Sequence, residues 1–226
     1  MNVLVIAAHP DDEVLGCGGT IARLTQEGHV VHVAILGEGI TSRHLERDQA
    51  DRAEVEALHA HSRQVSELLG CAELQLFNLP DNRFETLPLL ELVKIIEEMV
   101  ARLQPQVIYT HHGGDLNIDH VTVHRAVLTA TRPVNGHPVK EVYAFEVPSS
   151  TEWAFAQFQP VFRPNCFVAI DATIETKLQA MSLYKSEMRS CPHPRSLESL
   201  RAAAKRWGAV AGFEHVEAFE LIRSIR

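Results

Sequence analysis

Short apolar runs rich in β-branched residues alternate with longer runs of helical periodicity along the chain. The predicted strands cover residues 2–8, 30–36, 73–77, 106–110, 141–146, 165–170 and 214–221. The predicted helices cover residues 15–27, 45–69, 86–103, 120–131, 173–185 and 196–211. This alternation is typical of βαβ units, in which helices flank a mainly parallel sheet. Because no long linker interrupts the 226 residues, we expect one α/β domain over residues 1–226.

Charge and composition exclude several classes of protein. The formal net charge is −8 and no basic block offsets it, which argues against a nucleic-acid or anionic-membrane surface. The longest apolar stretches are about 7 residues, whereas a membrane-spanning helix needs about 20. The N-terminal residues lack the charged region and cleavage site of a signal peptide. The four cysteines form no CxxC pair, which favours a reducing cytoplasmic location and gives no zinc-finger pattern.

The residues His9-Pro10-Asp11-Asp12-Glu13 directly follow the first predicted strand. An imidazole and spare carboxylates therefore stand where a strand ends and a helix begins, which is where open α/β sheets bind their ligands. The stretch Gly16-Cys17-Gly18-Gly19 comes next. It does not match GxGxxG, so dinucleotide binding is disfavoured, and we expect these glycines to allow close packing of the helix on the sheet.

Polar side chains also follow the next three predicted strands. They are Glu38 and Arg43, then Asp81-Asn82-Arg83, then His111-His112, Asp115, Asn117, Asp119 and His120. Because the carboxyl ends of parallel strands meet at one edge of a sheet, we expect these groups to converge on one cleft.

Three residues are predicted to bind a divalent metal. His9 and Asp12 are three positions apart in a tight turn, and nitrogen and carboxylate ligands of this kind suit Zn²⁺. A catalytic site needs a third protein ligand from another strand end, and His120 is the best candidate. Neighbouring side chains diverge, so Asp11 is predicted to face away from Asp12 and to act as the general base for water activated by the metal.

Simpler interpretations exist for some of these residues. Either Asp11 or Asp12, taken alone, stands at a position where an aspartate commonly serves as a helix N-cap. Two interpretations of Glu13 are equally good. It either supports the metal ligands from behind, or is an acidic residue in the first helical turn that the helix dipole favours. His124 is four residues after His120, as in HExxH helices, but the glutamate of that motif is missing. We therefore favour His120 alone as the ligand.

Two motifs together resemble the LmbE/PIG-L family of metal-dependent deacetylases. They are His9-Pro10-Asp11-Asp12-Glu13 and Asp115-Leu116-Asn117-Ile118-Asp119-His120. The resemblance extends over essentially the whole chain, including residues 79–84, 149–153 and 184–213. It implies a Rossmann-like fold, one Zn²⁺ or another divalent metal per chain, and removal of an acetyl group from an N-acetylated sugar. Carried over by position, it assigns the same three ligands and the same base.

The second motif departs from the family at one position. Many members have His-x-Asp-His, in which the Asp orients a histidine that stabilises the oxyanion, whereas this chain has Asn117 before Asp119 and His120. A neutral amide is an adequate oxyanion donor, worth roughly 3–4 kcal/mol at a preorganised site. Asn117 is therefore the predicted donor, and His112, His124 and His193 remain the alternatives.

The substrate is predicted less closely than the chemistry. Candidate substrate contacts are Arg43, Asp81, Arg83, His112 and Trp153, with Glu152 and Arg195 as further candidates. The expected partner is a small N-acetylated sugar or conjugate, and the resemblance implies a homo-oligomer, either trimer or hexamer. The alternatives are an amidase acting on a thiol or antibiotic conjugate, a nucleotide-binding oxidoreductase, and a non-catalytic metal- or sugar-binding protein.

Overall fold

The computed structural model describes residues 1–134 and 136–226 of the chain. The strands are β1 (Asn2–Ala7), β2 (Val30–Gly37), β3 (Glu73–Leu79), β4 (Val107–His111), β5 (Glu141–Phe145), β6 (Cys166–Ala169) and β7 (Val216–Ser224). The helices are α1 (Asp12–Gln26), α2 (Arg52–Leu68), α3 (Leu89–Leu103), α4 (Ile118–Ala130), α5 (Ile174–Leu183) and α6 (Leu197–Ala211), with short 3-10 turns between some of them. The α/β class predicted from the sequence is confirmed.

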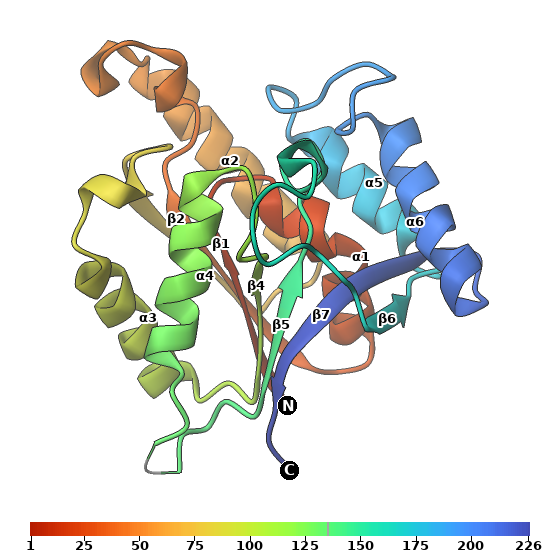
Figure 1. Cartoon of the computed structure of the whole chain (residues 1–226). Helices are drawn as coiled ribbons and strands as arrows, with labels where there is room; N and C mark the ends of the chain where they lie inside the picture. Colours follow the sequence, from red (N-terminus) through yellow and green to blue (C-terminus); the bar gives the residue numbers. More distant parts are fainter. Residues whose placement is uncertain (135) are drawn as a thin grey trace.

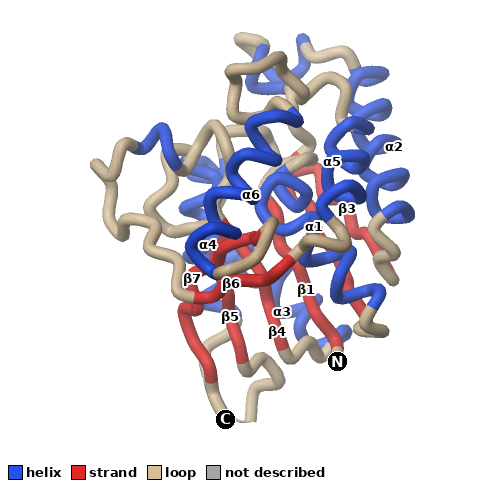
Figure 2. The backbone as a smooth tube through the Cα atoms, turned by 90° about the vertical axis from the view of Figure 1, so that its right-hand side faces the viewer, coloured by secondary structure: helices blue, strands red, loops and turns tan. Residues whose placement is uncertain are grey.

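One sheet contains all the described strands, in the order β3-β2-β1-β4-β5-β7-β6. The first five strands in this order are parallel to one another. β7 is antiparallel to both β5 and β6 and lies between them. In Figure 1 both chain ends lie at the lower edge of the sheet, opposite the upper edge where β1 and β4 run into the loops before α1 and α4. Figure 2, turned by 90°, again has both ends at the bottom.

The sheet separates two apolar cores, which follow from the alternation of side chains along each strand. On one face, β1 residues Val3 and Val5 pack with residues of α1, α2, α5 and α6. On the other face, Leu4 and Ile6 pack with residues of α3 and α4. Because β1 is buried on both faces, its sequence is continuously apolar, as is typical of a central parallel strand.

Two helices begin at positions that differ from the sequence prediction. The helix predicted over residues 45–69 begins at Arg52, because the side chain of Asp51 accepts a hydrogen bond from the N–H of Ala53 and caps it. The residues before it form two 3-10 turns instead. The first helix begins at Asp12 rather than residue 15, so Asp12 and Glu13 lie in its first turn.

Helix α1 lies unusually close to the sheet. A Cβ on Gly16 would come 2.2 Å from the ring of Phe145, and one on Gly19 would come 2.8 Å from Ile170. Cys17 leaves helical geometry, with φ −148°, so the helix is kinked there. Beyond the kink, the N–H groups of Gly19 and Thr20 donate to the buried carboxylate of Glu217. The interpretation of the glycines as close-packing residues is confirmed at Gly16 and Gly19.

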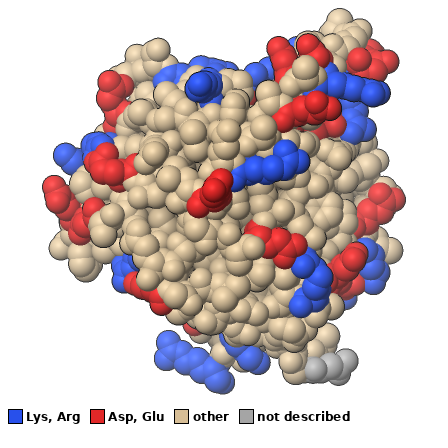
Figure 3. Space-filling model, turned by 180° about the vertical axis from the view of Figure 1, so that it is seen from behind, with Lys and Arg blue, Asp and Glu red and all other residues tan. Residues whose placement is uncertain are grey.

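The outer surface carries charges of both signs. On the face seen in Figure 3, acidic and basic side chains are interspersed, with wide uncharged areas between them and no broad basic area over the described part of that face. The described helices include none with the combination of length and apolar character that crossing a membrane requires.

Candidate active site

A polar cleft of about 190 Å³ lies at the carboxyl ends of the parallel strands. Its lining comes from the loops after β1, β2, β3, β4 and β5, from the segment between α5 and α6, and from one residue each of α2 and α4. The residues are His9, Pro10, Asp11, Gly39, Ile40, Ser42, Arg43, Leu58, Asp81, Asn82, Asn117, His120, Ser149, Ser150, Glu187 and Arg195. Among the strand-end residues expected to converge, the cleft lining includes His9, Asp11, Arg43, Asp81, Asn82, Asn117 and His120.

The three predicted metal ligands lie together. Asp12 Oδ2 is 3.3 Å from His9 Nδ1 and 3.2 Å from His120 Nε2. One ligand atom from each residue lies within 4.8 Å of the others. Ligands bound tetrahedrally at about 2.05 Å stand about 3.3 Å apart, so the spacing fits Zn²⁺ or a similar ion. Both ring nitrogens of the buried His120 lack a hydrogen-bond partner among the described residues, which leaves Nε2 free to ligate.

A buried carboxylate orients His9. Asp119 Oδ2 is 2.9 Å from His9 Nε2, and Asp119 Oδ1 accepts a hydrogen bond from the N–H of Phe84. With Nε2 donating to Asp119, the lone pair of Nδ1 points towards Asp12. Asp81 Oδ1 also lies 3.3 Å from Nε2, while its Oδ2 accepts from the N–H and hydroxyl of Ser42. We therefore favour Nδ1 as the ligating atom over a second grouping of His9 with Asp81 and Asp119.

A second carboxylate lies behind His120. Asp115 Oδ1 is 3.2 Å from His120 Nδ1, the nitrogen that faces away from Asp12. The hydroxyls of Ser150 and Thr151 donate to Asp115, and so does the N–H of Asn117. Each histidine thus has its own carboxylate, hydrogen-bonded at His9 and in ionic contact at His120, and carboxylates in these places orient metal-ligating histidines in many proteins.

The electrostatics of the cluster favour a cation. Burial would raise the pKa of Asp12, but His120 and His111 outweigh it and lower that pKa well below its usual value. Burial would lower the pKa of His120, but Asp12 and Asp115 outweigh it and raise that pKa to about 9. The carboxylates therefore draw positive charge to the place where a divalent ion would be held.

Asp11 is held in a strained backbone conformation at the start of α1. Its φ is 105° and its ψ −27°, in the left-handed region that side-chain-bearing residues avoid. The N–H of Asp11 donates to Glu13 Oε2 at 3.1 Å, and Glu13 Oε1 accepts from the hydroxyl of Tyr184 at 2.6 Å. Glu13 and Tyr184 are both buried. Of the two interpretations of Glu13, the structure favours support of the active-site turn.

The carboxylate of Asp11 is paired with an arginine. Arg195 Nη1 donates to Asp11 Oδ2 at 2.9 Å and lies 3.4 Å from Glu187 Oε2. Arg43 Nη2 donates to both oxygens of Glu187 at 2.7 Å. Burial raises the pKa of Asp11 well above its usual value, and the positive charge of Arg195 opposes that rise.

Asn117 lines the cleft and is also the N-cap of α4. Its side-chain oxygen accepts from the N–H of Asp119, and its Nδ2 donates to Asn82 Oδ1 at 2.9 Å. An amide nitrogen carries two hydrogens. Among the described residues only this one Nδ2 bond is formed, so a second N–H is available to a ligand in the cleft.

The predicted substrate contacts are divided among several places. Arg43 and Asp81 line the cleft. Arg83 lines a separate groove beside α2 and donates to the carbonyl of Leu45. His112 is buried against Glu220 and the carbonyl of Pro160, facing a different cavity. Trp153 lies outside the cleft lining, with its ring edge-on to His193 at 5.5 Å between centroids.

The remaining histidine alternatives also lie outside the metal cluster. His124 Nδ1 bonds the carbonyl of His111, and His193 Nδ1 accepts from the N–H of Arg195. Neither lines the cleft. Two residues of the site have no individual role predicted from the sequence. Asp115 is expected only to converge on the cleft with the other strand-end residues, and Glu187, which no strand end precedes, is not predicted at all.

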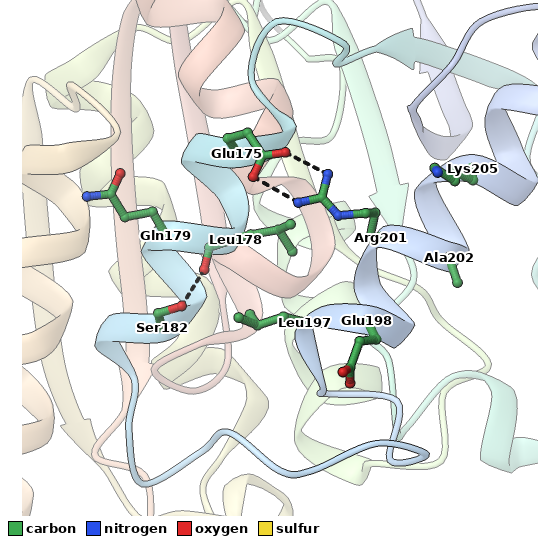
Figure 4. Close-up of a pocket in the computed structure, with 9 residues that line it drawn as sticks. All are labelled: Glu175, Leu178, Gln179, Ser182, Leu197, Glu198, Arg201, Ala202 and Lys205. Atoms are coloured by element: carbon green, nitrogen blue, oxygen red, sulfur yellow. Dashed lines mark hydrogen bonds and ion pairs between the residues drawn. The ribbon is translucent and has the colours of Figure 1, made fainter.

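A larger hollow elsewhere lacks this chemistry. About 720 Å³ of space lies between α5 and α6, bordered by Leu178, Leu197 and the paired side chains of Glu175 and Arg201 (Figure 4). None of the residues predicted to act in catalysis or metal binding borders it. The polar cleft is therefore the better candidate for the active site.

The sequence is similar to known deacetylases. The model of the family described as PIG-L, GlcNAc-PI de-N-acetylase, matches residues 4–131. The uncharacterised deacetylase YaiS of Escherichia coli is 28% identical over 191 residues, covering 82% of this chain and 91% of that protein. The probable N-acetyl-α-D-glucosaminyl L-malate deacetylase 2 of Bacillus cereus is 26% identical over 193 residues, covering 82% and 83%.

The fold is similar to that of a solved deacetylase. The N,N'-diacetylchitobiose deacetylase of Pyrococcus horikoshii superposes with a TM-score of 0.78, covering 98% of this chain and 84% of that one. At 20% identity this likeness concerns the fold alone. The matched family segment, residues 4–131, contains all three predicted metal ligands and the predicted base.

Proposed function

The chain belongs to the PIG-L family of GlcNAc-PI de-N-acetylases, and we propose that it hydrolyses the acetamide of an N-acetylated sugar conjugate with the help of a divalent metal. Its relatives and structural neighbours include deacetylases, which cleave carbon–nitrogen bonds other than peptide bonds. The observation that carries the proposal is the meeting of His9, Asp12 and His120 beside the buried carboxylate of Asp11.

His9, Asp12 and His120 would hold the metal. One nitrogen from each histidine and one carboxylate oxygen form a ligand set suited to Zn²⁺, with room for other divalent transition metals. When bound, the ion supplies Lewis acidity that polarises a carbonyl and lowers the pKa of water. Asp119 and Asp115 keep the two imidazole rings turned towards Asp12.

Asp11 is the group that accepts the proton of the attacking water. Its carboxylate lies at the wall of the cleft, and the ion pair with Arg195 favours the ionised, basic form. Attack of the water oxygen on the acetyl carbon forms the new C–O bond, while one proton moves to Asp11. The hydrogen bond from its own backbone to Glu13 keeps the carboxylate in place during this transfer.

Asn117 donates its second side-chain N–H to the oxyanion that develops on the acetyl oxygen. An amide does not release a proton at neutral pH, so Asn117 cannot protonate the leaving amine. The proton taken up by Asp11 is therefore the one delivered to the nitrogen as the C–N bond breaks. The second proton of the water remains on the acid that forms and then passes to the amine, so the balanced products are acetate and the protonated amine.

The cleft supports a substrate with one small reacting group and a larger remainder. Its volume of about 190 Å³ is below the roughly 300–1,000 Å³ that encloses a drug-sized ligand. The cleft therefore takes the acetamido group and its immediate neighbours. Side chains of Asn82 and Ser149 at its wall offer hydrogen bonds to sugar hydroxyls. The rest of the conjugate stays outside the cleft, so the cleft alone does not determine which conjugate binds.

A substrate panel tests the proposal. The metal-free protein would be reloaded with Zn²⁺ and incubated with N-acetylglucosamine, its α- and β-linked conjugates and N-acetylated thiols, with acetate and free amine both measured. We expect metal-dependent release of both products in equal amounts from a sugar conjugate. The Asp11→Asn variant, with metal content confirmed, should lose nearly all of this release.

Two other outcomes would change the proposal. Release only from a non-sugar amide, such as an acetylated thiol, would keep the chemistry and replace the substrate class. Normal turnover by Asp11→Asn would refute the assignment of the base. Loss of bound metal in Asp12→Ala and His120→Ala is expected independently of which substrate is used.

A further inference from the structure

A second group of metal-ligating side chains lies at the far end of the sheet, on the edge formed by β6 and β7. Asp171 follows β6, and Glu214 and His215 directly precede β7. The antiparallel register pairs Ala169 with Val216, so these segments, 44 residues apart in sequence, are brought together. None of the three residues belongs to the catalytic cluster or lines its cleft.

The backbone fixes this group. The N–H of Ile170 donates to the carbonyl of His215 at 2.9 Å, and the N–H of His215 donates to Asp171 Oδ1 at 2.5 Å. The bond from the N–H of His215 holds the Asp171 carboxylate beside the imidazole ring of the same histidine. Asp171 Oδ1 lies 3.6 Å from His215 Nδ1, beyond hydrogen-bond distance.

His215 is a buried imidazole without partners. Its exposed fraction is 6%, and among the described residues neither Nδ1 nor Nε2 has a hydrogen-bond partner. A buried polar side chain left in this state costs about 1–3 kcal/mol, so most are satisfied by protein, water or an ion. The ring instead contributes a nitrogen to a group in which one ligand atom of Asp171, Glu214 and His215 each lies within 4.8 Å of the others.

We propose that Asp171, Glu214 and His215 bind a second divalent transition-metal ion. One imidazole nitrogen and two carboxylate oxygens suit Zn²⁺, Co²⁺ or Ni²⁺ better than Ca²⁺ or Mg²⁺, which prefer oxygen ligands alone. Three protein ligands on an exposed edge leave positions for water. The ion joins the loop after β6 to the two residues directly before β7, so its role is to hold the edge of the sheet together.

The charges around the group favour this assignment. In the described parts of the chain, no lysine or arginine forms an ion pair with Asp171 or Glu214. The nearby acid Glu175 is different, because both of its oxygens accept hydrogen bonds from Arg201 (Figure 4). The two carboxylates beside His215 are therefore uncompensated, and a divalent cation supplies the missing positive charge.

Metal counting in the 226-residue chain tests the proposal. Metal-free wild type would be titrated with Co²⁺ and with Zn²⁺, and the bound equivalents would be measured by elemental analysis after gel filtration and by the visible absorption of Co²⁺. We expect two equivalents. The double variant D171N/E214Q changes two exposed side chains and should bind one equivalent, with deacetylase activity unchanged.

Metal counting in the Asp12→Ala variant distinguishes the two metal sites. Asp12→Ala should remove the catalytic equivalent and keep the other, and D171N/E214Q introduced into Asp12→Ala should leave none. Glu175→Gln is the matched control, since it removes a neighbouring acid that is already paired, and it should not change the stoichiometry. One equivalent in wild type, or two equivalents that persist in D171N/E214Q, would overturn the proposal. Metal retained by Asp12→Ala with D171N/E214Q would count against the catalytic ligand set instead.

Discussion

The side chain of Glu13 accepts a hydrogen bond from the backbone N–H of Asp11, the residue with φ of 105°. Glu13 and Asp11 belong to the same turn. The hydrogen bond from the Asp11 N–H to the Glu13 carboxylate therefore stabilises the backbone conformation of the proposed base. A conformation of this kind costs on the order of 1–3 kcal/mol and persists only where its surroundings enforce it. Glu13 is thus a positioning residue for Asp11.

We predict that Glu13→Gln lowers kcat on the order of 10- to 100-fold while KM and bound metal change little. Glutamine has the same shape but one acceptor oxygen in place of two, so its two terminal atoms cannot accept separately from the Asp11 N–H and the Tyr184 hydroxyl as the carboxylate does. Misplacing a reacting group by about 1 Å has an effect of this size. The measurement is steady-state kinetics alongside elemental analysis.

A double variant distinguishes positioning from general loss of structure. In the Asp11→Asn background the carboxylate base is already absent, so Glu13→Gln should reduce the residual turnover little further. An undiminished effect there would contradict the role. Tyr184→Phe, which removes only the hydroxyl bonded to Glu13, should produce a smaller decrease of the same kind.

Arg195 is predicted to set the acidic limit of activity. Burial raises the pKa of Asp11 and Arg195 opposes the rise, so Arg195→Gln should raise this pKa further. Because the base acts only when ionised, the acidic limb of kcat/KM against pH should move to higher pH. Arg189→Gln is the control, since Arg189 is exposed and bonds only nearby backbone carbonyls. A limb that stays in place in Arg195→Gln would refute the electrostatic role.

The carboxylates behind the two histidines are predicted to govern metal affinity. Asp119→Asn removes the charged acceptor at His9, and Asp115→Asn does the same at His120. Each change should weaken Zn²⁺ binding about 10- to 100-fold, the range found for partners of metal-ligating histidines. Competition with a chelating dye gives the dissociation constants. The exposed Asp48→Asn provides the baseline, and affinity equal to that baseline would exclude the role.

The buried ion pair of Lys177 and Glu217 is predicted to be sensitive to loss of one partner. Lys177 Nζ lies 2.6 Å from Glu217 Oε1 and also donates to the carbonyl of Leu15. Lys177→Met leaves the Glu217 charge buried without it, and removing one partner of such a pair typically costs about 3–5 kcal/mol. Urea unfolding should show this loss, whereas the exposed Lys205→Met should change the free energy of unfolding by less than about 0.5 kcal/mol.

The central residues of the site could be predicted because they are local to strand ends. His9, Asp11 and Asp12 follow β1, and His120 lies in the first turn of the helix after β4. Parallel strands bring such positions to one edge whatever the details of the loops. The central strands could be predicted for a separate reason, since burial on both faces makes the sequences of β1 and β4 apolar and rich in β-branched residues.

The partners of these residues could not be predicted because they depend on long-range packing. Arg195 reaches Asp11 from 184 residues away, in a segment that follows a helix rather than a strand. His111 and His112 are neighbours with similar sequence surroundings, yet His112 faces Glu220 on β7 and His111 stacks on His120. Nothing in the local pattern indicates which neighbouring element each histidine contacts.

The start of α2 illustrates a different difficulty. Helical periodicity continues back to residue 45, but the side chain of Asp51 satisfies a backbone N–H that a longer helix would bond internally. A capping side chain ends the helix where periodicity alone does not. The antiparallel direction of β7 was also beyond the sequence pattern, which predicts strands but not their orientation at the sheet edge.

The position of β7 between β5 and β6 has a consequence for synthesis on the ribosome. Among the described strands, β5 and β6 do not pair with each other, so until residues 216–224 are available β5 has one unpaired edge and β6 lacks a partner. The strands that carry the metal ligands are made long before this point. A nascent chain therefore acquires the strands of its catalytic edge before β7 is available, and the open edges of β5 and β6 favour aggregation during the interval before β7 pairs with them.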